Sequence, residues 1–208
     1  MKRLFKKLVV FMTAICILTG ASVSYVSAAT TTSYFTGSKF NKHALKYYID
    51  TTPTMTDIPD DKEDNYLYWN SDIQSAFNMW NSIMEIYSID LSFTKTNTKS
   101  EADIIVRYYR SPSLMNVVHT WSSSTVYKTS TINVDDYQLI TQDTSSEQFW
   151  LSILHEVGHT IGLADIEAYQ AAAGGFTSIM VYDVFSMYHT EFPTYDFDRY
   201  NLIALYGV

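Results

Sequence analysis

Cysteine is almost absent from the chain, whose 208 residues include only Cys16. A single thiol excludes an internal disulfide and any metal or redox motif that needs two or more cysteines. Cys16 also lies in an N-terminal segment that we expect to be removed from the mature protein. Any metal ion in the mature chain must therefore be held by histidine, aspartate, glutamate or tyrosine.

Positive charge is also scarce. The chain has 14 lysines and arginines against 22 acidic residues, so its formal net charge at pH 7 is −8. An acidic chain lacks the basic surface that binds nucleic acid, and anionic membrane surfaces repel it. We therefore expect no nucleic-acid partner and no stable association of the mature protein with a membrane.

The start of the chain lacks an apolar run long enough to span a bilayer. Residues 8–21 form an apolar run of about 14 residues, whereas a spanning helix needs roughly 20. The run follows the basic stretch MKRLFKK and precedes small residues, an order typical of a secretory signal peptide cleaved after Ala28. An uncleaved membrane anchor is the alternative. A lipid anchor at Cys16 is disfavoured by the bulky Ile15 before it.

Removal of residues 1–28 takes away four basic residues and no acidic one, which brings the net charge to about −12. The signal peptide predicts a secreted, extracellular protein. Its basic start, the compact size of the chain and the lack of disulfides fit a bacterial source.

The rest of the chain is the size of one domain. Residues 29–36 form a short polar lead-in, and residues 37–208 are expected to form the single folded domain. The residue pattern predicts strands at 43–50, 91–96, 102–110, 116–121 and 126–135, and helices at 71–87, 144–162 and 197–207. Thr144 and Glu147 would cap the second helix, and Gly162 would end it. Little sheet follows that helix, so we expect an α+β domain.

The stretch LHEVGHTIGLADI, residues 154–166, holds two of the five histidines. His155 and His159 are four residues apart, so on a helix they share a face and aim two ring nitrogens at one point. Glu156 follows His155 directly, so on a helix it lies beside the metal ion but not on the face that carries the two histidines. This position suits a general base rather than a ligand. The short motif alone is equally compatible with a helix that carries two incidental histidines.

The continuation of this stretch favours a metal site. Gly158 inside a helix costs about 1 kcal/mol relative to alanine, which suggests that another backbone passes close by. Gly162 permits the left-handed conformation that turns the chain back. Asp165 can then complete the site as a third ligand, with a fourth position open to water. Three rival third ligands have less suitable spacing: Glu167, Asp183 and His189.

Residues 155–165, in the pattern His-Glu-x-x-His-x-x-Gly-x-x-Asp, resemble the long zinc signature of the metzincin metallopeptidases. The stretch SIMVYD, residues 178–183, resembles their Met-turn. Metzincins usually have histidine where this chain has Asp165, although some small bacterial members resemble it in using aspartate, and catalytic zinc accepts a carboxylate. The order of AFNMWNSIMEIYSIDLSFTKT, EADIIV, the zinc signature and ALYG is similar to the matrixins within this group.

The resemblance implies one catalytic Zn²⁺ and a metzincin-type zincin fold. That fold has a mixed twisted sheet over an active-site helix, a Met-turn and a C-terminal helix. Met180 would lie beneath the metal, although a plain core methionine is the alternative. Tyr182 would match the tyrosine that some metzincins place near the zinc.

The region between the predicted strand at 102–110 and the zinc helix departs from many animal matrixins. It lacks the His- and Gly-rich pattern that holds structural zinc and calcium there. We interpret His119 in this region as a packing or hydrogen-bonding residue rather than a ligand. Ca²⁺ is compatible with the acidic loops, but no loop has a recognisable calcium pattern.

The sequence thus predicts a secreted, monomeric zinc endopeptidase that acts on protein or peptide substrates. Glu156 would be the general base, and Tyr182 would donate a hydrogen bond to the oxyanion. The strand at 102–110 is a candidate edge for pairing with a peptide. Two alternatives stay open: a catalytically silent secreted binding protein with the zinc fold, and a metal-dependent amidase.

Overall fold

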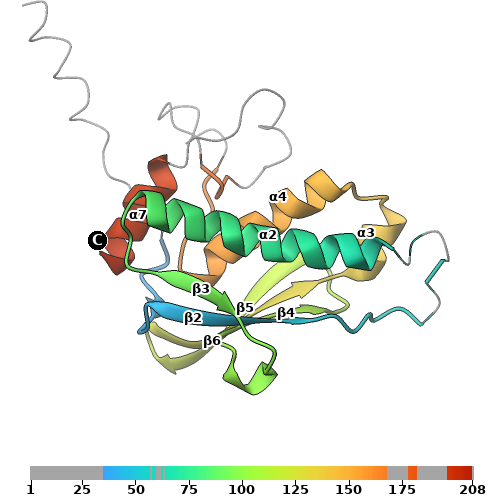
Figure 1. Cartoon of the computed structure of the whole chain (residues 1–208), viewed down its shortest axis with the longest axis horizontal. Helices are drawn as coiled ribbons and strands as arrows, with labels where there is room; N and C mark the ends of the chain where they lie inside the picture. Colours follow the sequence, from blue (N-terminus) through green and yellow to red (C-terminus); the bar gives the residue numbers. More distant parts are fainter. Residues whose placement is uncertain are drawn as a thin grey trace, which may run out of the picture. The chain divides into compact units, whose positions relative to one another are not determined.

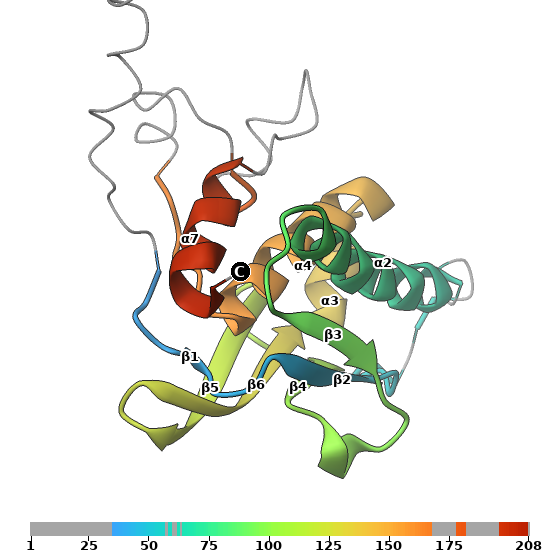
Figure 2. The same ribbon diagram turned by 60° about the vertical axis from the view of Figure 1, so that its left-hand side comes forward.

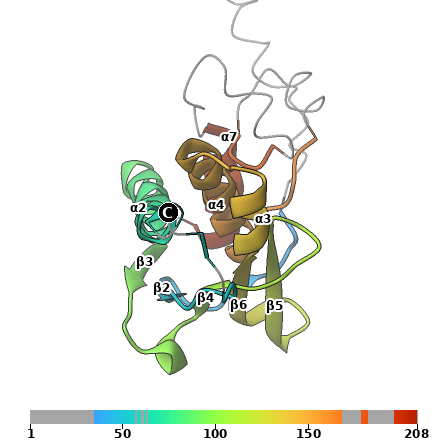
Figure 3. The same cartoon turned by 90° about the vertical axis from the view of Figure 1, so that its right-hand side faces the viewer.

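The computed structural model describes residues 35–56, 58–59, 62, 64–167, 178–181 and 196–207, without the side chains of residues 196 and 197. These residues contain a six-stranded sheet. The longer helices lie on one side of this sheet (Figures 1 and 3). This arrangement agrees with the predicted α+β class.

The sheet is mostly parallel. Its main path runs in the order β1, β6, β4, β2, β3, and every pair along it is parallel. The sixth strand, β5, pairs with β6 in the antiparallel direction. The strand bounds are β1 Lys39–Phe40, β2 Ala44–Asp50, β3 Ser92–Lys95, β4 Ile104–Tyr108, β5 Met115–Ser123 and β6 Val126–Val134. A mixed sheet therefore forms, as predicted.

Strand β4 lies inside the sheet, between β2 and β6. The prediction that residues 102–110 form an edge for pairing with a peptide is therefore wrong. Ile104, Val106 and Tyr108 are buried, and such a strongly apolar strand is typical of the interior of a parallel sheet. Among the described residues, β5 has β6 as its only strand partner, so β5 is the antiparallel edge.

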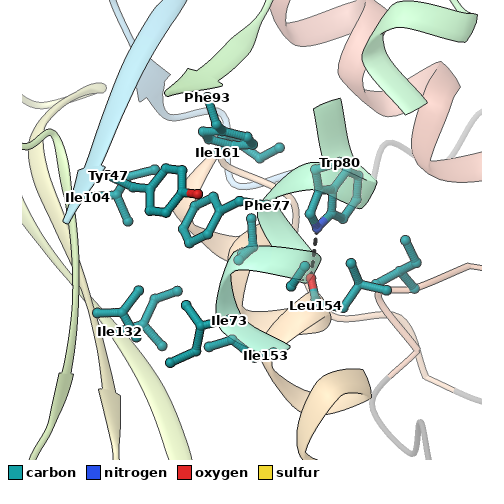
Figure 4. Packing of buried hydrophobic residues seen from close by; sticks show 14 of the residues in the cluster. Tyr47, Ile73, Phe77, Trp80, Phe93, Ile104, Ile132, Ile153, Leu154 and Ile161 are labelled. Atoms are coloured by element: carbon teal, nitrogen blue, oxygen red, sulfur yellow. Dashed lines mark hydrogen bonds between the residues drawn. The ribbon is translucent and has the colours of Figure 1, made fainter. Parts of the chain in front are cut away.

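Helix α2, Asn65–Ile86, packs its apolar stripe against the sheet and against helix α4. It begins before the predicted start at residue 71, because Tyr66 and Trp69 continue the buried stripe by further turns. Phe77 stacks on Tyr47 of β2, and the Trp80 indole donates a hydrogen bond of 2.8 Å to the Leu154 carbonyl (Figure 4). Burial of a large apolar side chain such as Phe77 or Trp80 contributes about 2–3 kcal/mol to the free energy of unfolding. The packing of α2 therefore holds α4 firmly in place.

Helix α4, Ser146–Thr160, lies between α2 and the C-terminal helix α7, Asp196–Tyr206 (Figure 2). Its N-terminus carries a capping box formed by Ser145 and Gln148. The predicted pair Thr144 and Glu147 is wrong by one residue. The hydroxyl of Tyr206 donates to the Ile161 carbonyl, which ties α7 to the end of α4.

Three short elements were not predicted. Helix α3, Asp136–Thr141, is capped by the Asp135 side chain, and β1 has only two residues. Short elements show too little periodicity to be recognised in sequence. A three-residue 3₁₀ helix, η3, covers Lys99–Glu101. Within the part of the chain that the structure describes, no helix has the length and apolar character that crossing a membrane requires.

Candidate metal centre

Helix α4 places two histidine rings side by side near its C-terminus. The ring centroids of His155 and His159 are 4.7 Å apart, and the ring planes are perpendicular at 90°. Their Nε2 atoms lie 3.1 and 3.2 Å from the same oxygen, Oδ1 of Asp165. One ligand atom from each of these three residues lies within 4.8 Å of the others. The three side chains can therefore converge on one metal ion.

A main-chain carbonyl fixes the opposite edge of each ring. Nδ1 of His155 donates to the Ile179 carbonyl and Nδ1 of His159 donates to the Leu163 carbonyl, both at 2.9 Å. Because a carbonyl only accepts, each Nδ1 carries a hydrogen and each Nε2 is the nitrogen available for coordination. Two imidazoles and one carboxylate, with a position left open, are an established ligand set for catalytic zinc. The donor set of this chain therefore fits zinc.

Gly162 reverses the chain between His159 and Asp165. Its φ angle is +94°, in the left-handed region, and a Cβ at this position would overlap the carbonyl oxygen of Ser38. The Gly162 carbonyl also accepts a hydrogen bond of 2.9 Å from the amide of Thr36. Glycine is thus required here both by backbone conformation and by the close approach of the segment before β1.

Gly158 makes room for the floor of the site. A Cβ there would overlap the sulfur of Met180 and lie 3.2 Å from the Trp80 ring. The close neighbours are thus side chains, and the prediction that another backbone passes close to Gly158 is wrong. Met180 is itself buried, so its thioether packs directly below the turn of α4 that separates the two histidines.

The comparison with known families agrees with this geometry. The family model described as Matrixin matches residues 39–207. The chain belongs to the matrixin family. The predicted resemblance is therefore confirmed, and the family is one of zinc-dependent metalloendopeptidases. The comparison with curated proteins found no match.

In this matrixin, Glu156 lies on the wall of a cavity of about 320 Å³ next to His159. The remaining lining residues are Thr36, Met115, Asn116, Val117, His119 and Leu163. Burial raises the pKa of Glu156, and this effect outweighs the opposing effect of the two histidines. A raised pKa brings a carboxylate closer to the range in which it can both take up and release a proton.

The hydrogen bonds among the three donors shift the pKa values of Asp165 and His159. Hydrogen bonds from the rings of His155 and His159 hold the pKa of Asp165 well below its usual range. Burial alone would lower the pKa of His159, but its hydrogen bonds with Asp165 and with the Leu163 carbonyl raise it overall. The raised pKa means that His159 keeps a proton up to a higher pH than a free imidazole does, and a metal ion must compete with that proton for the ring.

A buried aspartate on α7 supports the matrixin site from a distance. Asp198 accepts hydrogen bonds from the Ser178 hydroxyl at 2.5 Å and from the Ile179 amide at 2.8 Å. Ile179 in turn supplies the carbonyl that holds His155. The role of Asp198 was not predicted from the sequence. The signal that could have revealed it is an acidic residue on the same helical stripe as the buried Leu202 and Leu205.

The structure brings together the predicted His155, Glu156, His159 and Asp165, with Gly162 and Met180 beside them. Among the rival ligands, Glu167 is exposed and is not part of this group of donors. Three residues named in the sequence analysis lie outside the described residues: Tyr182, Asp183 and His189. His119 forms the predicted packing and hydrogen-bond contacts, but it also faces the cavity.

Proposed function

We propose that this matrixin is a secreted endopeptidase with one zinc ion held by His155, His159 and Asp165. Its general base would be Glu156. The observation that carries the proposal is the convergence of three donor atoms within 4.8 Å of one another, next to a cavity that Glu156 also lines.

A zinc ion in this place would polarise a peptide carbonyl and lower the pKa of a water molecule. Glu156 would remove a proton from water during attack on the carbonyl carbon, and would then deliver that proton to the nitrogen of the leaving amine. Tyr182 would donate a hydrogen bond to the oxyanion. That last role is supported by the family signature and by the position of Tyr182 two residues after Met180.

The substrate would lie along β5. This strand is the antiparallel edge of the sheet, and Met115, Asn116 and Val117 from it line the cavity. An extended peptide can add to such an edge through main-chain hydrogen bonds. β5 thus replaces β4 as the strand that would align the peptide with Glu156.

Secretion is supported by the order of basic, apolar and small residues in residues 1–28. N-terminal sequencing of the protein recovered from culture medium would test it. We expect the mature chain to begin at Ala29, and a chain that stays with the cells and keeps residues 1–28 would contradict the proposal.

The role of Glu156 is tested by Glu156→Ala. We expect the variant to bind zinc as the wild type does and to lose peptide cleavage by a factor of about 100 or more. Glu147→Ala is a matched control, because Glu147 is an exposed glutamate in the first turn of the same helix. Normal turnover by Glu156→Ala would remove the proposed base.

The ligand set is tested by Asp165→Ala and Asp165→His. Loss of the carboxylate should weaken zinc binding by about 100-fold or more, whereas histidine at this position should restore binding. Glu167→Ala provides the control from the rival ligand. Zinc affinity that is unchanged in Asp165→Ala would show that Asp165 is not a ligand.

The reaction class is tested by incubation of the purified mature protein with a mixed peptide library, with and without a chelator. We expect internal cleavage that the chelator stops and added zinc restores. Binding without cleavage would indicate the silent binding protein. Cleavage restricted to non-peptide amides would indicate the amidase.

A further inference from the structure

His119 lies outside the metal group but on the wall of the same cavity. It comes from the edge strand β5 and lines the cavity together with Glu156 and His159. The group of metal donors consists of His155, His159 and Asp165 and does not include His119. Its imidazole thus faces the place where we propose the substrate to bind, without being a ligand.

The His119 ring is held in one orientation. It stacks on Tyr127 with centroids 3.9 Å apart and planes within 2° of parallel. Its Nδ1 lies 2.8 Å from the hydroxyl oxygen of Ser130. Tyr127 is itself fixed by a hydrogen bond of 3.0 Å between its hydroxyl and that of Thr36. A ring that is locked on one face and one edge is ready to make a contact at its other edge.

The hydrogen bonds of Ser130 favour one tautomer of His119. The Ser130 hydroxyl is fully buried and donates to the carbonyl of Thr160, at the end of α4, over 3.4 Å. It has one hydrogen, so towards His119 its oxygen must accept. Were the hydroxyl turned to His119 instead, the Thr160 carbonyl would lose the one side-chain donor that the described residues give it. This arrangement favours the tautomer of His119 with the hydrogen on Nδ1 and a lone pair on Nε2.

Nε2 of His119 has no partner among the described residues, and it is not an enclosed atom. Burial, followed by the charge of His159, lowers the pKa of His119 to about 4. The ring is therefore neutral at pH 7, and its lone pair remains an acceptor. A neutral acceptor in a cavity next to a peptide-binding edge complements a peptide N–H group.

We propose that His119 is a substrate-binding residue whose Nε2 accepts a hydrogen bond from an N–H group of the peptide that lies along β5. This inference rests on the proposed function for the position of the peptide. It assigns to His119 a contact with the substrate in addition to its internal contacts with Tyr127 and Ser130.

Two substitutions separate the two nitrogens of the ring. Asn at position 119 keeps a donor near Nδ1, for the bond to Ser130, and removes the acceptor at Nε2. Gln places its amide near Nε2 and gives up the Ser130 bond. The inference predicts that kcat/KM falls about five- to tenfold in His119→Asn and less in His119→Gln, as expected for the loss of one hydrogen bond. A purely structural His119 predicts the reverse order.

Peptide affinity keeps the test separate from the proposed function. The dissociation constant of a good library peptide is measured in the zinc-loaded Glu156→Ala variant, with His, Asn or Gln at position 119. We expect Asn to weaken binding about five- to tenfold and Gln to weaken it less. ¹⁵N NMR of the ring should show Nε2 unprotonated when free and shifted when the peptide is bound.

The outcomes are distinct. If the affinity for the peptide follows the predicted order, with Asn at position 119 weaker than Gln, but the wild type cleaves no peptide, the proposed function fails and the role of His119 stands. If the wild type cleaves peptides while Asn and Gln at position 119 have equal effects, or Gln the larger one, the role of His119 is overturned. A ring with a protonated Nε2 would overturn it as well.

Discussion

The two histidines of the metal group are oriented by different regions of the molecule. The local region is the reversal at Gly162, and the distant region is the turn at Ile179 together with helix α7. His159 donates to the carbonyl of Leu163, which is four residues further along the chain. His155 donates to the carbonyl of Ile179, which is 24 residues further along and is held by Asp198 from α7. The first contact is part of the local reversal at Gly162, whereas the second depends on the packing of a distant helix.

The difference teaches which parts of a metal site a motif encodes. A contact over four residues forms once α4 and its reversal form, so the spacing of the signature contains it. A contact over 24 residues forms only when the turn at residues 178–181 and helix α7 are in place. We therefore expect damage to the local region to affect folding first, and damage to the distant region to affect metal binding more selectively.

The largest effect is expected in the local region, for Gly162→Ala. The substitution combines a positive φ with a Cβ that overlaps the Ser38 carbonyl, and backbone atoms cannot move aside cheaply. We expect the free energy of unfolding to fall by about 3 kcal/mol or more, measured by chemical denaturation. Gly37→Ala is the matched control, because Gly37 also has a positive φ of +76° but open space around it. That control should cost only about 1 kcal/mol, and equal losses would show that the approach of Ser38 is unimportant.

In the distant region, the contribution of Asp198 to the free energy of unfolding should depend on pH. Burial raises the pKa of Asp198 from 3.8 to about 6, against the opposing hydrogen bonds from Ser178 and Ile179. Between these values the folded state holds a proton that the unfolded state has released, so this residue's contribution to stability falls as pH rises from about 4 to 6. The change is on the order of 3 kcal/mol. It is constant above that window.

Asp198→Asn removes the titrating group and keeps the shape. Denaturation of both proteins at several pH values should give a difference, wild type minus variant, that shrinks from pH 4 to pH 6 and is then flat. A difference that is independent of pH would mean that Asp198 is already ionised at pH 4.

Much of the fold and the local half of the site could be predicted from the sequence. The stripe of α2 and the alternation in β2 report burial directly, because each element has its own period. The spacing of His155, His159, Gly162 and Asp165 similarly describes a single helix and its reversal. These features depend on neighbours in sequence.

The rest depends on which distant segments meet. The apolar run of β4 indicates burial, but the order of strands places it between β2 and β6 and leaves β5 as the edge. Asp198 has no motif around it, since its partners Ser178 and Ile179 are about 20 residues away. His119 was predicted to pack, and it does, but its exposure to the cavity follows from the pairing of β5 with β6.

The selective effect on metal binding is tested by Asp198→Ala. Loss of the carboxylate leaves the Ile179 amide and the Ser178 hydroxyl without their acceptor, so the carbonyl that orients His155 is less well placed. We expect zinc affinity to fall about tenfold, as for other groups behind a metal ligand, measured by competition with a chelator. Asp136→Ala is the matched control, because Asp136 is another buried aspartate that accepts hydrogen bonds, from Thr54 and Tyr66, away from the metal group. If both variants lose zinc affinity equally, the effect is general destabilisation.

The smallest effect concerns the packing between the turn and α4, at Gly158. Gly158→Ala gains about 1 kcal/mol of helix propensity, but the new methyl group overlaps the sulfur of Met180 and approaches Trp80. Because the methionine end can move only within a filled core, we expect a net loss of about 1 kcal/mol in the free energy of unfolding. In Gly158→Ala combined with Met180→Ala, the shortened side chain leaves room for the methyl group. The overlap costs about 2 kcal/mol against the propensity gain of about 1 kcal/mol, so the loss in the double variant should be about 2 kcal/mol smaller than the sum of the two single losses. Additive losses would mean that the Trp80 ring, not Met180, opposes the new methyl group.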